Sequence, residues 1–307
     1  MRELWRGNAN AWECDELGHM NVQFYLAKAS EAVAHLARLA GLGGVFNSNT
    51  HATLVARQIH IKFLAEARPG APLFIHGGFT RYAASSAELT LVMRHGFSQQ
   101  IAATFRLELD HVSPHEGRPF DWPKRFTERY QSLAIDAVAE ALPRGITETA
   151  SDQQISLERA DELGLEQIGM GCFSTAEMGP FGRIRSDVLL GRVSNSVINF
   201  QTGFPEQAEY HLGRTQTRIG GALLETRILP RHWPRAGDAY VIRSGLRAVG
   251  PKVRNLVHWV LDPQTGRPWW TSEGVAAPMD LDARKLHQPG EKMQARLEAA
   301  VKPELRP

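Results

Sequence analysis

The sequence predicts an α+β protein built from two tandem units, each with one long central helix wrapped by an antiparallel sheet. Two observations carry this prediction. Segments of the first half have counterparts in the same order in the second half, which indicates an internal duplication. In the first half, one long apolar segment precedes several short alternating segments, and this order is typical of a helix followed by strands.

The composition fits an ordinary globular protein with a sizeable core, because 43% of the 307 residues are hydrophobic. The net charge of +2 gives no argument for nucleic acid or a membrane surface. Arg makes up 28 of the 35 basic residues, which suits a phosphate-bearing ligand or reflects genomic base composition.

The N-terminus lacks the apolar core of a signal peptide, and no apolar run approaches the roughly 18–20 residues of a membrane span. We expect a cytoplasmic protein.

The duplication is visible in three pairs of segments. They are 68–79 with 234–246, 60–64 with 225–229, and 16–25 with 189–200, the last pair matched at Gly18 and Gly191. A single pair could arise by chance, but three pairs in one order favour duplication.

The first half begins with a predicted helix from about Asn21 to Ala40, where apolar residues keep helical spacing until a group of glycines ends it. Four strand patterns follow, with a hairpin loop at 94–98 between the last two. They are 58–63, 72–80, 87–93 and 101–109. This part, residues 1–112, is predicted as the first unit.

Residues 113–170 fit neither copy and are predicted as a connection: a proline-rich loop, then an amphipathic helix from Phe126 that ends near Pro143. The second unit, 171–285, again shows strand patterns, at 253–261 and 269–277. Pro205 is expected to cut its helix short. Residues 286–307 are predicted as a short C-terminal helix and a tail.

The most polar stretch, ECDELGHMNVQFYLAKASEA, stands just before and within the first helix. It resembles the start of the 4-hydroxybenzoyl-CoA thioesterase family, whose members carry Asp-x-x-Gly-His/Val-x-Asn, then Tyr and a downstream Glu. The matching positions are Asp15, Gly18, His19, Asn21, Tyr25 and Glu31. The second Asn that often follows in the family is Val22 here. The resemblance extends over most of residues 1–112, whereas the second half is similar by layout only.

The whole chain is therefore similar to double-hot-dog acyl-CoA thioesterases. The resemblance implies two hot-dog units that form a pseudo-dimer, with the sheets joined, the two helices side by side and acyl-CoA sites in the seams. It also implies hydrolysis of an acyl-CoA by water, without a cofactor. The family's catalytic acid falls on Asp15.

The chemistry of thioester hydrolysis agrees with a carboxylate at position 15. A thioester needs a nucleophile at its carbonyl carbon and stabilisation of the oxyanion that forms. A carboxylate such as Asp15 either attacks directly, which gives a mixed anhydride, or activates water as a general base. The backbone N–H groups of the helix that begins near Asn21 are candidate donors to the oxyanion. The alternative for Asp15 is an acid that favours the helix dipole.

The other motif residues each have a functional and a structural interpretation. His19 could orient Asp15 or water or polarise the carbonyl, and Asn21 is the expected helix cap with a second use at the substrate. Gly18, Tyr25 and Glu31 are candidates for substrate binding. Their alternatives are a turn glycine, core packing and a satisfied polar contact.

In the second copy, Arg192 aligns with His19 and Ser194 with Asn21, while Val188 or, with one inserted residue, Asp187 takes the place of Asp15. The second copy is therefore expected to have lost its own site. Its Arg192, Ser194 and Asn195 could line the shared seam or meet the CoA phosphates, or they are capping and solvated residues.

Two further chemistries have little support. Cys14 lacks an identifiable His partner, and a free Cys is usually a small buried hydrophobe. No Cys or His spacing matches a metal-ligand set. Two other functions stay open: a non-catalytic acyl-CoA or lipid binder, and an enoyl-CoA hydratase, although no later Asp–His pair is identifiable. The acyl group and association into homo-oligomers are also open.

Overall fold

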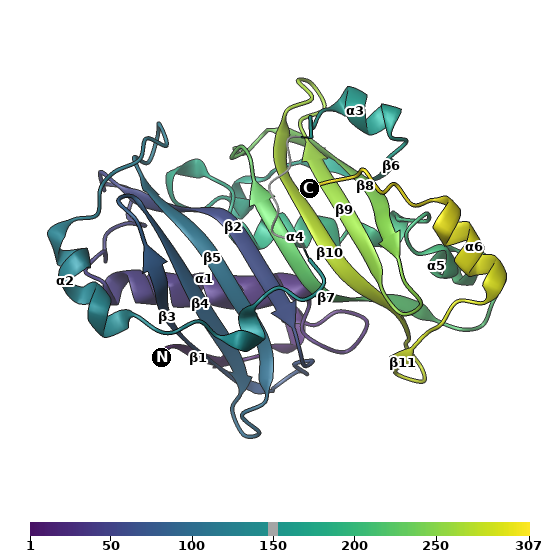
Figure 1. The fold of residues 1–307 in the computed structure, drawn as a ribbon, viewed down its shortest axis with the longest axis horizontal. Helices are drawn as coiled ribbons and strands as arrows, with labels where there is room; N and C mark the ends of the chain where they lie inside the picture. Colours follow the sequence, from purple (N-terminus) through teal and green to yellow (C-terminus); the bar gives the residue numbers. More distant parts are fainter. Residues whose placement is uncertain (147–152) are drawn as a thin grey trace. The chain divides into compact units, whose positions relative to one another are not determined.

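The chain forms two compact units in a computed structural model that describes residues 1–146 and 153–307 (Figure 1). Unit 1 comprises Met1–Leu142 and Met178–Leu190, and unit 2 comprises the described residues of Pro143–Glu177 and Gly191–Pro307. The bounds differ from the predicted 1–112, 113–170, 171–285 and 286–307, because most of the connection packs with one unit or the other. Residues 147–152 of the predicted connection lie outside the described residues.

Unit 1 contains one long helix and a five-stranded antiparallel sheet with the order β1-β3-β4-β5-β2. The elements are β1 (Arg2–Asn8), the short 3-10 helix η1 (Ala11–Glu13), α1 (Val22–Leu39), β2 (Thr53–Phe63), β3 (Pro72–Tyr82), β4 (Ser86–His95) and β5 (Ile101–Val112). The helix and the four strands predicted from the first half are confirmed.

Helix α1 forms because its apolar side chains recur at helical spacing and can be buried together. Tyr25, Leu26, Ala29, Val33 and Leu36 are all buried. The Asn21 side chain caps the first turn by accepting from Gln23 N–H. The helix ends at Leu39, and Gly41 follows with φ +80°, a left-handed conformation that suits glycine.

Unit 2 repeats this topology. Its sheet has the order β6-β8-β9-β10-β7, which matches unit 1 strand for strand. The strands are β6 (Glu166–Cys172), β7 (Ile219–Pro230), β8 (Ala239–Val249), β9 (Arg254–Leu261) and β10 (Pro268–Asp280), with the short β11 (Lys285–Leu286) beside β10. The helices are α3 (Leu157–Glu162), α4 (Ser186–Ser194), whose first residues belong to unit 1, α5 (Pro205–His211) and α6 (Glu291–Ala299). The predicted C-terminal helix is confirmed.

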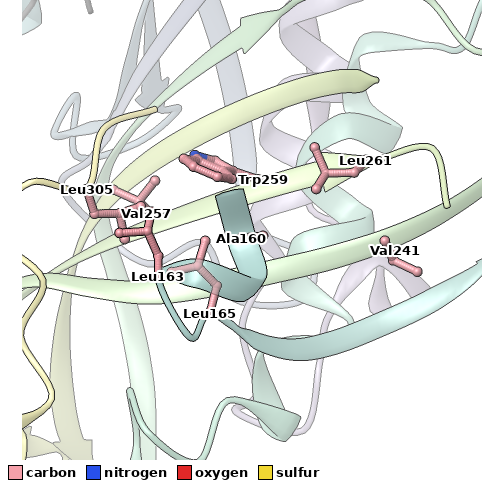
Figure 2. Close-up of a cluster of buried hydrophobic side chains, with 8 residues drawn as sticks. All are labelled: Ala160, Leu163, Leu165, Val241, Val257, Trp259, Leu261 and Leu305. Atoms are coloured by element: carbon pink, nitrogen blue, oxygen red, sulfur yellow. The ribbon is translucent and has the colours of Figure 1, made fainter. Parts of the chain in front are cut away.

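One face of β8 and β9 is covered by α3 and the chain end (Figure 2). Ala160 and Leu163 approach from the α3 side, and Leu305 approaches from the C-terminal segment, to pack against Val257 and Trp259. The Trp259 indole N–H also donates to Arg306 O at 2.8 Å. This contact anchors the C-terminal residues on the sheet.

The predicted helix from Phe126 to Pro143 is too long. Helix α2 spans only Lys124–Leu133, after which the chain becomes extended. Ile135 N–H donates to Phe79 O at 2.8 Å, and a side chain at Gly78 would meet Ile135 Cγ2 at 2.7 Å. Pairing with β3 therefore overrides the helical pattern of this segment.

The expectation that Pro205 cuts the second helix short is also wrong. Helix α4 already ends at Ser194, and Pro205 is instead the first residue of α5. Proline is favoured at that position because its missing N–H would have no helical partner there.

Within residues 1–146 and 153–307, no helix combines the length and the apolar character that crossing a membrane requires.

Trp259→Ala is expected to lower the free energy of unfolding by about 3–5 kcal/mol, the usual cost of truncating a fully buried Trp. Trp259 is completely buried, and its loss also removes the anchor of Arg306. Urea denaturation measures the change. Trp12, which is 78% exposed, provides the control, and Trp12→Ala should change stability by less than about 0.5 kcal/mol. Equal effects of the two substitutions would contradict the assigned core.

Candidate active site

The candidate site is a tight turn that immediately precedes α1. Cys14 and Met20 form an isolated antiparallel bridge, and Asp15 N–H donates to His19 O at 3.1 Å. Gly18 N–H donates to Asp15 O at 3.0 Å. Gly18 has φ +78°, which a residue with a side chain adopts only with strain. The turn therefore holds Asp15 and His19 at its two ends.

The Asp15 carboxylate is held by two donors from its own segment. Leu17 N–H donates to Oδ1 at 3.0 Å, and Asn21 Nδ2 donates to Oδ2 at 3.3 Å. The side chain is 19% exposed, so it is neither in bulk water nor fully enclosed. Asn21, expected from the sequence as the helix cap, therefore also contacts the carboxylate.

Partial burial raises the pKa of the Asp15 carboxyl above its ordinary value, because desolvation disfavours the charged form. The positive charge available to His19 and the hydrogen bonds from Leu17 and Asn21 oppose this shift, while the charge of Glu16 adds to it. A carboxylate with a raised pKa is a stronger proton acceptor, which suits a general base.

Asn21 serves the helix and the carboxylate at once. Its Oδ1 accepts from Gln23 N–H at 3.0 Å, as the sequence predicts for a cap, while its Nδ2 donates to Asp15. Its backbone oxygen accepts from Phe24 N–H at 3.0 Å. Two of the expected first-turn donors are therefore engaged by Asn21 itself.

His19 lies between two acids. Its Nδ1 is 4.0 Å from Asp15 Oδ1, and its Nε2 is 3.7 Å from Glu66 Oε1. Both distances are longer than a hydrogen bond, so His19 makes no direct bond to either carboxylate and can attract them only in its protonated form. The sequence does not predict Glu66, since it follows β2 and only the fold brings it to the turn.

Tyr25 supports the site from within the core. Its hydroxyl accepts from Ala67 N–H at 3.0 Å and donates to Ala65 O at 3.4 Å. Ala67 O in turn accepts from Met20 N–H at 2.7 Å, at the end of the turn. Burial raises the pKa of Tyr25 to about 12, so its hydroxyl stays protonated near neutral pH. These contacts favour the structural interpretation of Tyr25 over substrate binding.

Glu31 and Cys14 also have structural partners. Glu31 Oε2 accepts from the Trp5 indole N–H at 2.9 Å, which ties α1 to β1 and does not involve Asp15. The Cys14 thiol donates to Asn10 O at 3.3 Å, and burial raises the pKa of this thiol. A raised pKa disfavours the thiolate that nucleophilic catalysis would need.

The predicted alignment of the second copy is wrong, because Gly191 lies inside α4 whereas Gly18 lies in the turn before α1. The corresponding turn is marked by the bridge between Met178 and Ile184. Counted from this bridge, the equivalents of Asp15, Gly18, His19 and Asn21 are Gly179, Gly182, Arg183 and Arg185. The second turn therefore has no carboxylate where Asp15 stands in the first.

The second-copy candidates occupy other positions. Arg192 forms an ion pair with Glu177, and its guanidinium lies 5.3 Å from the Tyr240 ring centroid. Ser194 is the last residue of α4, and Asn195 N–H donates to Gly191 O at 2.9 Å. A part in substrate binding for Arg192, Ser194 and Asn195 stays a prediction.

Asp187, the proposed substitute for Asp15, lies in the first turn of α4. It accepts from Arg185 Nε at 3.1 Å and from Gln23 Nε2 at 3.3 Å. Asp187 is thus engaged by these two groups and is not the equivalent of Asp15. Within residues 1–146 and 153–307, no three or more His, Cys, Asp or Glu side chains gather as a metal site would require.

The sequence and the fold of this chain were compared with those of known proteins. Residues 9–130, less than half of the chain, match the model of the thioesterase-like superfamily. The fold is similar to the 12:0-ACP thioesterase from Umbellularia californica, with a TM-score of 0.65 and 10% identity over 89% of this chain and 93% of that one. It is also similar to an acyl-ACP thioesterase from Bacteroides thetaiotaomicron VPI-5482, with a TM-score of 0.62 and 9% identity over 89% and 96%.

No curated protein matches the sequence. At such low identities the likeness to the solved structures shows the fold alone. The chain therefore shares the fold of these solved structures, in agreement with the hot-dog fold that the sequence predicts.

The stability of Asp15→Asn relative to the wild type is expected to rise with pH. Because burial raises the pKa of folded Asp15, the folded protein holds this proton more firmly than the unfolded chain does. The stability so gained is present below the unfolded pKa and is lost as pH rises through the folded pKa. The difference in Tm, variant minus wild type, should become more positive between about pH 3 and about pH 7. A difference that falls over this range would contradict burial as the dominant effect.

Proposed function

This chain has the hot-dog thioesterase fold and matches the thioesterase-like superfamily over residues 9–130, and from that premise we propose that it hydrolyses an acyl-CoA thioester to a free acid and CoA. The observation that carries the proposal is the partly buried Asp15 carboxylate, held by Leu17 and Asn21 directly before α1. We also propose that the chain is an internally duplicated hot-dog protein, which the identical strand order of its two units supports.

Asp15 acts by one of two balanced routes. As a general base it removes a proton from water while the water oxygen attacks the thioester carbonyl carbon. The carbon–sulfur bond then breaks, and CoA leaves as a thiolate that takes up a proton. As a nucleophile its carboxylate oxygen attacks the same carbon, CoA leaves, and water hydrolyses the resulting mixed anhydride.

The neighbouring groups have distinct roles in the proposal. Asn21 fixes the direction of the Asp15 carboxylate, and His19 moderates its charge from 4.0 Å. The first backbone N–H of α1, that of Val22, is assigned to the oxyanion, with help from the positive end of the helix. Gly18 allows the left-handed backbone of the turn, and the space beside it is open, since a Cβ there would meet no atom within 4 Å.

A second molecule is a candidate for the carrier of the acyl group. The two solved structures named above are of acyl-ACP thioesterases, so a thioester on acyl carrier protein is the alternative to acyl-CoA. Both carriers present the same thioester to Asp15, and the chemistry of the two routes is unchanged.

Asp15→Asn is expected to lower the rate of thiol release by about 100-fold or more, the scale for loss of a positioned acid–base group or nucleophile. The assay follows free thiol from acyl-CoA and acyl-ACP substrates of graded chain length. Glu16→Gln is the matched control, because Glu16 is an exposed carboxylate on the adjacent residue. Undiminished turnover in Asp15→Asn would remove Asp15 from the mechanism.

Two other outcomes of this assay would favour the other functions. Tight binding of acyl-CoA with no thiol release from any substrate would indicate a binding protein. Addition of water to an enoyl-CoA with the thioester intact would indicate a hydratase.

On the acidic side, the pH dependence of kcat/KM reports the pKa of the essential base in the free enzyme. The apparent pKa of this acid limb is expected to lie above the ordinary Asp value of about 3.9. Burial raises the pKa of Asp15, and the charge of Glu16 raises this pKa further. Glu16→Gln should therefore move the acid limb to lower pH without abolishing turnover. A limb that does not move, or moves upward, would show that it reports another group.

A further inference from the structure

We propose that the buried ion pair between Glu13 and Lys28 positions the catalytic turn on α1, so that both residues are positioning residues for Asp15; this inference rests on the proposed function. Lys28 lies in the second turn of α1, and Glu13 ends η1, two residues before Asp15. Both residues lie within the stretch 13–32, but neither is one of its six motif positions.

The pair is close and largely shielded from water. Lys28 Nζ donates to both oxygens of Glu13, at 2.7 and 2.8 Å, and the two side chains are only 5% and 11% exposed. The Lys28 ammonium also lies 5.1 Å from the Trp5 ring centroid. Two charges taken out of water tolerate little displacement, because removal of one leaves the other buried without an opposite charge.

Glu13 connects this pair to both ends of the turn. Its Oε2 accepts from Asn10 N–H at 2.8 Å, before the turn begins. Its backbone oxygen accepts from Asn21 N–H at 2.8 Å, where the turn ends and α1 starts. Lys28 therefore holds, through one residue, the segment that carries Asp15 and the cap that orients it.

The second half of the chain contains a similar ion pair. Glu177, at the end of η3 (Thr175–Glu177), pairs with Arg192 and accepts from Ser174 N–H at 2.8 Å, as Glu13 accepts from Asn10. Arg192 follows Ser186, the first residue of α4, by the same spacing as Lys28 follows Val22, the first residue of α1. A glutamate before the turn and a cation in the second turn of the helix thus recur together.

The turns that follow the two glutamates also agree in backbone geometry. Gly179 N–H donates to Arg183 O at 2.7 Å, as Asp15 N–H does to His19 O. Gly182 has φ +67°, close to the value at Gly18. The carboxylate, imidazole and amide of the first turn are absent from these positions in the second. The ion pair has therefore been kept where the acid has not, and its common role is to build the turn.

This common role gives a specific consequence in unit 1, where the turn carries the acid. Loss of the Lys28 charge leaves Glu13 buried without its cation, and Glu13 then has to turn toward water and draw the turn with it. A displacement of Asp15 by about 1 Å is enough to cost on the order of 100-fold in rate.

The test compares Lys28→Met, Lys28→Arg and Asp15→Asn in the full chain, with kcat, KM, the acid limb of kcat/KM and Tm as readouts. Lys28→Met is expected to lower kcat by about 10- to 100-fold with a smaller change in KM. Its acid limb should move to lower pH, because a loosened turn exposes Asp15 to water and relieves the burial that raises its pKa. Lys28→Arg should retain most activity, since Arg is the cation of the second pair.

Glu177→Gln is the matched control for stability. It removes the same kind of carboxylate from a turn without an acid, so Tm should fall while the acid limb stays in place. If Lys28→Met does not fold, the doubly neutral Glu13→Gln/Lys28→Met variant takes its place, because it leaves no buried charge without a partner.

The inference is overturned if folded Lys28→Met, or the doubly neutral variant, keeps the wild-type kcat and acid limb while Asp15→Asn is inactive. It is also overturned if Glu177→Gln moves the acid limb as far as Lys28→Met does. Full activity of Asp15→Asn would instead overturn the proposed function of Asp15, so the two failures are distinguishable.

Discussion

The site depends on one constraint: the residue that begins α1 must also hold the carboxylate that precedes it. Asn21 meets both needs because an amide side chain carries an acceptor and a donor on the same plane. Its oxygen satisfies a helix N–H group, and its nitrogen reaches Asp15. Serine or aspartate would also cap the helix, but neither offers an amide donor to a neighbouring carboxylate. The helix start and the direction of Asp15 are therefore set together.

The same constraint explains why a site of this kind lowers stability. The turn keeps Asp15 partly buried, and burial makes its ionised form unfavourable. The hydrogen bonds from Leu17 and Asn21 recover part of that cost without removing it. Such a conflict between local stability and reactivity is expected at functional sites. It contrasts with the Lys28–Glu13 pair, in which each charge has its full partner.

The sequence predicts the long helix and the strands of unit 1 because burial imposes a regular spacing on each of them. It also predicts Asn21 as the cap of α1, whereas the hydrogen bond from Asn21 to Asp15 became visible only in the structure. Glu66 and Lys28 could not be found in this way, because their contacts depend on how α1 and the end of β2 fold back on the turn. The misaligned second copy has a similar cause: Gly191 matches Gly18 by letter, whereas Gly182 matches it by conformation.

The two turns show that the backbone shape of the candidate site can occur without its acidic side chain. A glutamate, a helical cation and a left-handed glycine recur in both halves, which links them to the shape of the turn and not to the acid. Replacement of His19 and Asn21 by Arg183 and Arg185 changes the charge of the second turn from mixed to positive, and Arg185 is held by Asp187. With Gly179 in place of the acid, no proton acceptor remains at that position. Under the proposed function the reaction therefore belongs to the first turn, while the second turn has the same backbone shape without the acid.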